Sequence, residues 1–443
     1  MTALLPLALL CELLALVTRV QPLSVASGAL LTTFFAWHWR SLMPYPRRLG
    51  LVTLSLLGYW ALSGSASWEQ GQRLLASAAY YGAFVGALGL MHCLVKRQRQ
   101  LGELHRLLLA GAPATLYPRY LLSTFAISSI LSFGMLNLVC GSLERYLQSR
   151  RYSETQRREG RRGVMVAALR GFALVPLLAP TSVAVAILTR ELPGLSWGTL
   201  LPFGLLAALF LLLAGWPLEN HRLRQLRTSD AGPSRGDPVR FRGLLLGSLL
   251  GILLIALLAA LTPLSATQAA MLLVPLAVLG TLRTQGEKPR AIHTEVRETL
   301  AGMRNEIFIF ACSAVLGGLT ATLVPVGALA EQFSTTPLAL FGLGSASMLT
   351  IIALALLGVA PIISLSVCVA LLAQLAGHGV AVMQPAVALL SGFSLAMLLS
   401  PYGPSALMLA RHAQLSPWRI AFGWNGLFVL LVLGPLLLVP LLA

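Results

Sequence analysis

The chain has 443 residues, of which 57% are hydrophobic and 11% charged, and its formal net charge is +17 at pH 7. A mean hydropathy of +0.80 excludes a soluble globular domain and indicates a polytopic membrane protein. The charge does not indicate nucleic-acid binding, because the basic residues cluster in short segments between apolar stretches, as the positive-inside rule describes. The sequence therefore predicts the lipid bilayer as a partner and excludes nucleic acid.

A membrane-spanning helix needs about 20 apolar residues, and the chain offers a series of such stretches. They lie at residues 2–18, 22–38, 48–64, 74–95, 163–190, 198–217, 243–262, 267–282, 304–328, 380–411 and 418–442. The first resembles a signal peptide, but it lacks a basic start and carries Glu12, so we predict a first span.

Two further apolar stretches, 111–144 and 337–376, are too long for one crossing and contain small residues at their centres. We predict that each forms a re-entrant helical hairpin. The segments "KRQRQLGELHRLLLAG" and "RAIHTEVRETLAGM" have apolar residues at helical spacing with charges on the other face, which predicts helices lying in the membrane interface. The expected fold class is an all-α polytopic membrane protein with about 11 transmembrane helices and two re-entrant hairpins.

Charge sets the expected topology. If both hairpins leave the membrane on the side from which they entered, the N-terminus is cytoplasmic and the C-terminus extracytoplasmic. Most of the 32 basic residues then lie in cytoplasmic loops, as the positive-inside rule requires. The expected units are N-terminal scaffold helices (1–95), a first repeat (96–217), a cytoplasmic linker (218–242), a second set of scaffold helices (243–336) and a second hairpin with a broken span and final helix (337–443).

An internal repeat relates two spans. "RGFALVPLLAPTSVAVAILTRELPGLSW" (170–197) aligns without a gap with "SGFSLAMLLSPYGPSALMLARHAQLSPW" (391–418), and the matches include Gly-Phe, Pro, Arg and Trp. Because these residue types are rare matches in an apolar chain, we infer a duplication. In the topology set by charge the two copies cross the membrane in opposite directions, so the repeats are inverted.

Prolines interrupt both copies, at Pro180 and Pro401. A proline inside a helix costs about 3 kcal/mol or more, and irregular backbone survives within the membrane only inside protein or against a water-filled cavity. Paired broken helices in inverted repeats indicate the binding site of a secondary transporter. The expected binding residues at the breaks are Pro180, Thr181, Ser182, Ser400, Pro401, Tyr402, Gly403 and Ser405. The alternative is a pair of proline kinks satisfied by neighbouring helices.

An interfacial helix, a re-entrant hairpin and a broken span, duplicated with inverted topology, resemble the ion transporter superfamily. This superfamily includes divalent-anion/sodium symporters and related citrate, gluconate, lactate and arsenite permeases. The local matches are "GVAPIISLSV" (358–367) and "LSPYGPSALML" (399–409). The resemblance implies transport of anions, coupled to Na⁺ or H⁺, by an elevator motion of the hairpin-bearing domain. The Ser-Asn-Thr signature of the divalent-anion symporters is absent, and the candidate tip residues are Asn137 and Ser364.

The expected function is therefore secondary active transport of a small anion, resembling an organic carboxylate, across the bacterial inner membrane, without enzymatic activity. Na⁺ or H⁺ is the expected coupling ion, and no other cofactor is expected. The histidines and the five cysteines lack metal-ligand spacing, so we expect no metal site and free thiols. A homodimer is one alternative for the oligomeric state. The alternative function is a non-transporting membrane component, such as an assembly partner or an integral membrane transferase, with the same fold.

Overall fold

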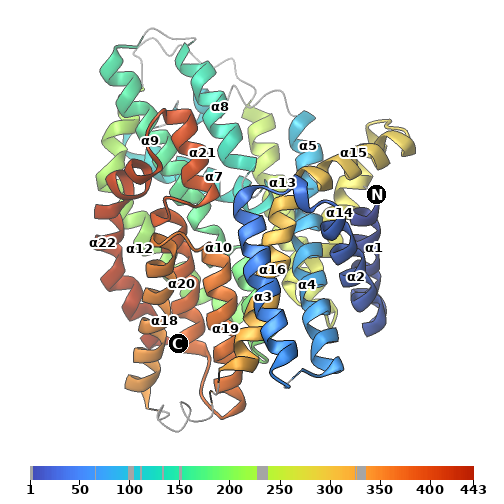
Figure 1. The fold of residues 1–443 in the computed structure, drawn as a ribbon. Coiled ribbons are helices and arrows are strands. Elements are labelled where there is room, and N and C mark those ends of the chain that lie inside the picture. Colours follow the sequence, from blue (N-terminus) through green and yellow to red (C-terminus); the bar gives the residue numbers. More distant parts are fainter. Residues whose placement is uncertain are drawn as a thin grey trace.

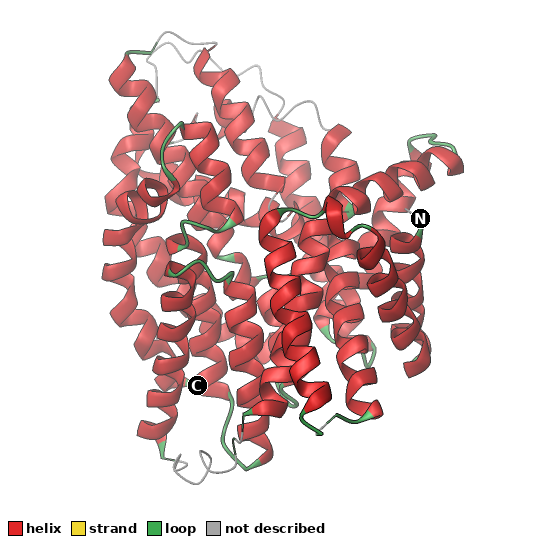
Figure 2. Ribbon diagram, in the orientation of Figure 1, coloured by secondary structure: helices red, strands yellow, loops and turns green. Residues whose placement is uncertain are grey.

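The computed structural model describes residues 3–64, 66–97, 104–109, 112–131, 134–148, 152–226, 238–324, 326 and 336–443. Helices joined by short loops make up these residues (Figure 2). Long apolar runs favour this arrangement, because only a helix satisfies every backbone group of a lone segment in hydrocarbon. The predicted all-α class is confirmed.

One group of helices, here called the scaffold body, fills one half of the molecule (Figure 1). Within it α4 packs against α2, α14 and α16, and α1 packs against α2. Its helices are α1 (Leu4–Thr18), α2 (Gln21–Trp37), α3 (Pro44–Leu62), α4 (Trp68–Gly89), α5 (Met91–Arg97), α13 (Pro238–Leu261), α14 (Ala266–Thr284), α15 (Pro289–Gly302) and α16 (Arg304–Leu323).

The other half, here called the hairpin body, contains both hairpins and both broken spans (Figure 1). Its helices are α6 (Leu104–Leu109), α7 (Leu116–Leu131), α8 (Gly134–Gln148), α9 (Glu154–Ala173), α10 (Val175–Leu178), α11 (Val183–Glu191), α12 (Trp197–Arg224), α18 (Pro337–Leu356), α19 (Pro361–Gly377), α20 (Met383–Leu399), α21 (Pro404–Ala413) and α22 (Trp424–Leu438). The two bodies meet where α16 packs along α19, and α13 and α5 also contact α7.

Eight helical stretches in the described part are long and apolar enough to cross a membrane. One of them, α18, is the first arm of the second hairpin, and the others correspond to predicted spans. The remaining predicted spans are α1, α2, α3 and α13. Helices α1 and α2 have 15 and 17 residues, or about 22 and 26 Å at 1.5 Å per residue, against about 30 Å of hydrocarbon. For these four helices the crossing stays a prediction.

Two predicted loops are partly helical. Helix α9 begins at Glu154 rather than near residue 163, because Ser153 and Gln156 form a capping box that starts the helix within the arginine-rich segment. Helix α12 continues past Pro217 to Arg224, so the first residues of the predicted linker 218–242 are helical. The predicted interfacial helix at 96–111 falls partly outside the described residues; its first two residues end α5, and residues 104–109 form α6. The second one is present as α15, which lies obliquely across one end of the molecule (Figure 1).

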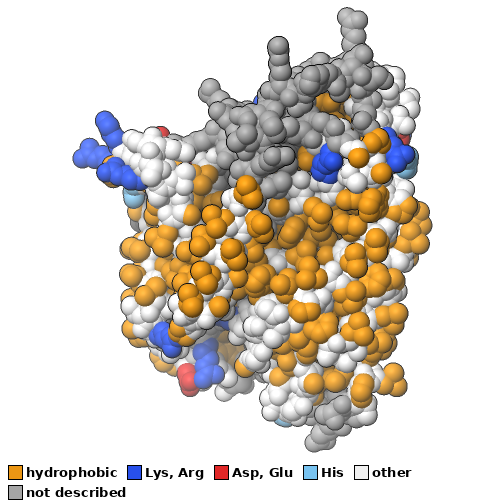
Figure 3. Space-filling view, turned by 180° about the vertical axis from the view of Figure 1, so that it is seen from behind, with side chains coloured by type: hydrophobic (Ala, Val, Ile, Leu, Met, Phe, Trp, Pro, Cys, Tyr) orange, Lys and Arg blue, Asp and Glu red, His pale blue; other side chains and the backbone are white. Residues whose placement is uncertain are grey.

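The surface fits a membrane environment. A band of apolar side chains covers the middle of the face shown in Figure 3, and Lys and Arg side chains lie mainly near the end that carries α15. The start of α9 also lies at this end, and the end of α12 lies beside it, where the Tyr152 hydroxyl donates to the Leu226 carbonyl over 2.7 Å. We call this the basic end. The N-terminus lies at the basic end, and the C-terminus lies toward the opposite end (Figure 1).

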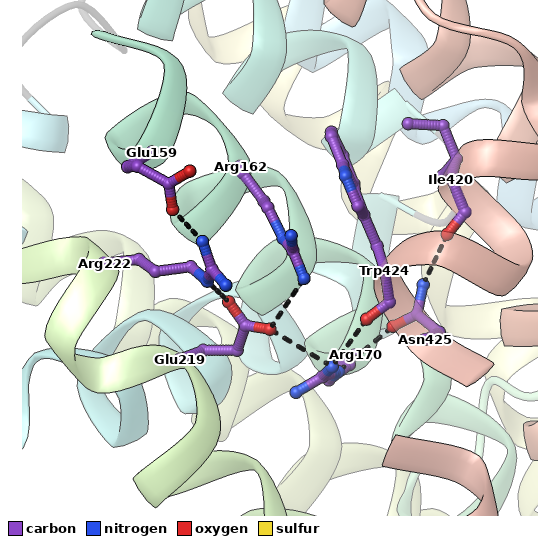
Figure 4. Close-up of polar contacts among 8 residues, drawn as sticks. All are labelled: Glu159, Arg162, Arg170, Glu219, Arg222, Ile420, Trp424 and Asn425. Carbon is purple, nitrogen blue, oxygen red and sulfur yellow. Dashed lines mark hydrogen bonds and ion pairs between the residues drawn. The ribbon is translucent and has the colours of Figure 1, made fainter. Parts of the chain in front are cut away.

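A buried ion-pair network fastens α12 and α22 to the first broken span (Figure 4). Glu219 of α12, 3% exposed, lies 3.6 Å from the Arg170 guanidinium of α9, which is 2% exposed. Arg162 and Arg222 lie 3.9 and 3.1 Å from the same carboxylate. Arg222 also pairs with Glu159 of α9. One carboxylate thus lies within 4 Å of three guanidinium groups at the junction of α9 and α12.

Arg170 continues the network into α22. Its Nε donates to the Asn425 side-chain oxygen over 3.1 Å and its Nη2 donates to the Trp424 carbonyl over 3.2 Å. Its guanidinium also lies 3.7 Å from the centre of the Phe428 ring, at cation–π distance. Buried charges persist only when they are paired and hydrogen-bonded. Helices α12 and α22 are therefore fixed to the broken spans and belong to the hairpin body.

Glu219→Gln tests this network. Loss of the carboxylate leaves Arg170 without its buried counter-charge, and removing one partner of a buried pair costs about 3–5 kcal/mol. We expect a clearly lower midpoint of thermal unfolding in detergent. The matched control is Glu69→Gln, because Glu69 pairs with Arg73 at an exposed site worth about 0.2–1 kcal/mol. Equal midpoints for Glu219→Gln and Glu69→Gln would show that the network does not hold the body together.

Candidate functional site

Both repeats contain a helix break at the predicted place. In the first, α10 ends at Leu178 and α11 begins at Val183, with extended backbone at Ala179 and Ser182. In the second, α20 ends at Leu399 and α21 begins at Pro404, with extended backbone at Ser400 and Gly403. Pro180 and Pro401 lie inside these breaks. The two broken spans run in opposite directions through the molecule (Figure 1).

The matched glycines of the repeat bring each broken span against the first arm of its own hairpin. A Cβ on Gly171 would lie 2.0 Å from the Thr124 hydroxyl oxygen of α7. A Cβ on Gly392 would lie 2.9 Å from the Met348 Cα of α18. Only glycine allows these approaches, which explains why the repeat has glycine at this position in both copies.

A hydroxyl ties each break to its hairpin. The Thr181 hydroxyl donates to the Ser129 carbonyl near the end of α7. The Ser400 hydroxyl donates to the Ala355 carbonyl near the end of α18 over 3.2 Å. Both side chains are buried. In this conformation both hydroxyl protons are donated to backbone carbonyls of the hairpins. Each hydroxyl oxygen can therefore still accept a hydrogen bond, but it cannot donate one to a ligand.

The matched tryptophans also reach back to their own breaks. The Trp197 indole donates over 3.1 Å to the carbonyl of Leu178, which is the last residue of α10. The Trp418 ring meets the Tyr402 ring edge-on, with 5.9 Å between centroids. Tyr402 itself is 53% exposed and lies against Gly358 of the second hairpin tip. The Trp match of the repeat therefore marks a contact that supports each break.

The remaining predicted residues of the breaks have local roles. The Ser182 hydroxyl accepts from the Ala184 amide over 3.2 Å and caps α11. The Ser405 hydroxyl donates to the Met397 carbonyl of the preceding half-helix over 3.4 Å. The Ser394 hydroxyl, which the sequence did not single out, donates to the Ala173 carbonyl over 2.6 Å and joins the two broken spans. The two copies thus meet directly next to their breaks.

The second hairpin tip is formed by residues 357–360. Gly358 has φ +97°, a left-handed conformation that favours glycine. The Ala360 amide donates to the Tyr45 hydroxyl of the scaffold body over 2.9 Å, and α19 begins at Pro361. One turn into α19, the Ser364 hydroxyl is buried and has no hydrogen-bond partner among the described residues. This buried hydroxyl is therefore free to donate to a ligand.

The first hairpin tip is described in less detail. Residues 132 and 133 lie outside the described residues. Asn137 belongs to α8, but its side chain also lies outside what the structure describes. Close to this tip, the buried Ser128 hydroxyl of α7 has no partner in the described part of the chain. Sequence reasoning missed Ser128 because one serine among several in an apolar helix gives no signal.

Four helices begin in this region, two at the breaks and two at the hairpin tips. They are α8, α11, α19 and α21. The helix that follows each break packs against the hairpin of the other repeat: α11 packs against α19, and α21 packs against α8. Each N-terminus carries amides without intrahelical acceptors and about half a positive charge. No Asp or Glu lies in either break or in residues 357–360. The arrangement can therefore hold an anion, and within the described residues no cluster of His, Cys, Asp or Glu could hold a metal ion.

Thr181→Val tests the tether of the first break. It removes the donor and leaves the buried Ser129 carbonyl unsatisfied, at a cost of about 1–3 kcal/mol. We expect faster amide hydrogen exchange in residues 179–186, measured by mass spectrometry, while Thr181→Ser keeps the exchange of the unaltered chain. Unchanged exchange in Thr181→Val would mean that the hydroxyl does not hold the break.

The sequence matches no family model and no curated protein. Its fold is similar to that of the Alcanivorax borkumensis YdaH transporter, whose crystal structure was described as having an unusual topology. The TM-score is 0.52 at 17% sequence identity, and the match covers 90% of this chain and 96% of that one. The chain therefore shares, along nearly its whole length, the fold of a membrane transporter.

Proposed function

We propose that this protein is a secondary active transporter that moves a small anion, of organic-carboxylate type, across the bacterial inner membrane. The observation that carries the proposal is the convergence of helix N-termini from two inverted repeats on one region inside the helical layer. Broken helices of inverted repeats form the substrate sites of many secondary transporters. The fold shared with a known transporter supports the same conclusion.

The chemistry of the region favours an anion. The helix N-termini supply partial positive charge, and the Ser364 hydroxyl is a donor that no described residue uses. Backbone amides and hydroxyls recognise carboxylate and phosphate-like oxygens without a fixed charge, so a substrate could leave again once bound. The proposed binding residues are those of the two breaks together with Asn137 and Ser364.

The division into two bodies favours an elevator mechanism. The hairpin body is held together by the Arg170–Glu219 network and by the hydroxyl tethers, whereas it meets the scaffold body mainly along α16 and α19. A rigid body that slides along such a seam would carry the site across the membrane. Na⁺ or H⁺ would drive this motion. The basic end would face the cytoplasm, which places the N-terminus inside and the C-terminus outside.

A non-transporting membrane component is the second candidate. It is favoured by the hydroxyls of Thr181, Ser400 and Ser405, all of which donate to backbone carbonyls, as they would in breaks with only a structural role. An assembly partner or an integral membrane transferase would need no free donor at the breaks. The free Ser364 hydroxyl is the feature that this candidate leaves unexplained.

Flux in proteoliposomes distinguishes the two candidates. The purified chain is reconstituted and uptake of labelled mono- and dicarboxylates, phosphate and sulfate is followed under an imposed Na⁺ or pH gradient. We expect saturable uptake of at least one anion. Ser364→Ala should weaken its apparent affinity by about 10- to 150-fold, because a hydrogen bond to a charged ligand is worth about 1.5–3 kcal/mol.

The matched control is Ser27→Ala. Ser27 is a buried serine of α2 in the scaffold body, and its hydroxyl donates to the Ala8 carbonyl over 2.8 Å. Its replacement should leave the apparent affinity unchanged. The proposal fails if no anion is taken up under either gradient. The site assignment alone fails if Ser364→Ala and Ser27→Ala transport equally well.

A further inference from the structure

The seam between the two bodies is closed by specific contacts. At α16 and α19 the backbones approach so closely that a Cβ on Gly317 would lie 2.8 Å from the Ser366 carbonyl oxygen. Beside this contact, the Tyr81 hydroxyl of α4 donates to the Glu191 carboxylate of α11 over 2.9 Å. The Arg190 guanidinium lies 3.8 Å from the centre of the Tyr80 ring. Two successive tyrosines of the scaffold body thus hold two successive charges of the hairpin body.

A cavity of about 240 Å³ opens in the seam next to these contacts. All four helices of the seam line it, with Gln70, Ser77 and Tyr81 from α4, Glu191 from α11, Gly317 from α16 and Ser366 from α19. Gln70 lies in the first turn of α4, which begins at the end opposite the basic end (Figure 1). The cavity therefore has one wall near that membrane face.

The opposite wall of the cavity approaches the proposed site. Ser366 follows Ser364 by two residues in α19, and it lies about 7–8 Å along the helix axis from Pro361, where α19 begins. Ile187, another lining residue, lies four residues after the start of α11. The cavity thus extends from near one membrane face to within about one or two turns of two of the converging helix N-termini.

The lining groups that remain free are neutral. Arg73 pairs with Glu69 at 2.5 Å, and Glu191 accepts from Tyr81 and lies 3.8 Å from Arg190. By contrast, the buried side-chain oxygen of Gln70 has no partner among the described residues, and as an acceptor it can take a hydroxyl proton from a ligand. The hydroxyls of Ser77 and Ser366 line the same cavity. Such a lining binds a ligand through hydrogen bonds rather than through net charge.

We propose that this cavity is an outer binding subsite on the transport path, which takes the transported anion before it reaches the hairpin tip. The proposal rests on the proposed function. The volume is below the range of about 300–1,000 Å³ typical of sites for drug-sized molecules, so the ligand is a small anion. A short hydroxycarboxylate fits best, because its hydroxyl can donate to the Gln70 oxygen while its carboxylate accepts from the serine hydroxyls. Charge selection takes place at the helix N-termini, and the subsite selects by size and hydrogen bonding.

Cysteine modification tests the subsite. Ser77→Cys and Ser366→Cys are made singly in a chain whose five native cysteines are replaced by serine, with Ser27→Cys of α2 as a matched buried control outside the cavity. An anionic, membrane-impermeant methanethiosulfonate is applied to spheroplasts or to inside-out vesicles. We expect both cavity cysteines to react only in spheroplasts and the control to react in neither. Modification should lower the initial rate of anion uptake at least tenfold, and saturating anion should slow the modification.

Contrary outcomes separate this proposal from the proposed function. Normal uptake after complete modification, or modification that the transported anion does not slow, would overturn the subsite alone. Absence of uptake in the unmodified parent would overturn the transport function and the subsite together. If the chain without cysteines does not fold, Gln70→Leu in the native chain provides the test. Its apparent affinity for the anion should fall several-fold, and an unchanged affinity would overturn the subsite.

Discussion

The fold depends on one constraint: backbone that leaves the helical conformation inside a membrane must find its partners within the protein. The Trp197 indole at the start of α12 donates to the carbonyl that ends α10, and the Thr181 and Ser400 hydroxyls of the breaks donate to carbonyls at the ends of α7 and α18. Each broken span is thus tied to its own hairpin. A hairpin and a broken span therefore form one structural unit, which the described chain contains twice.

Charge is used in two different ways in the hairpin body. At the junction of α9, α12 and α22, the charges of Arg170 and Glu219 are buried and paired, so that they join helices far apart in the sequence. At the breaks and tips, the positive potential comes from helix ends and not from side chains. Fixed pairs favour a rigid body, whereas unpaired amides and a free hydroxyl favour reversible binding. The separation of the two agrees with the elevator mechanism that we propose.

The length of two apolar stretches predicted the hairpins, the proline positions predicted the breaks at Pro180 and Pro401, and alignment of the sequence with itself revealed the repeat. The opposite direction of its two copies was predicted from the positions of the basic residues. The glycine and tryptophan matches indicated a duplication. The structure explains why these residues recur: Gly171 allows a close approach between helices, and Trp197 donates a hydrogen bond to the first break. The partners of the hydroxyls could not be predicted, because a serine or threonine in sequence does not reveal which distant carbonyl it meets. The role of Arg170 was missed for the same reason, since its partners come from α12 and α22. The start of α9 was missed because the capping box lies inside a run of arginines that favours a loop.

The most direct test of the account is the location of the transported anion in a cryo-electron-microscopy structure of the chain in lipid, determined with and without that anion. We expect additional density between the N-termini of α11, α19 and α21, within hydrogen-bond distance of the Ser364 hydroxyl. The tethers from Thr181 and Ser400 should remain in place. Density bound only at the arginines of the basic end, with the breaks unchanged and Ser364 without a ligand, would contradict the account.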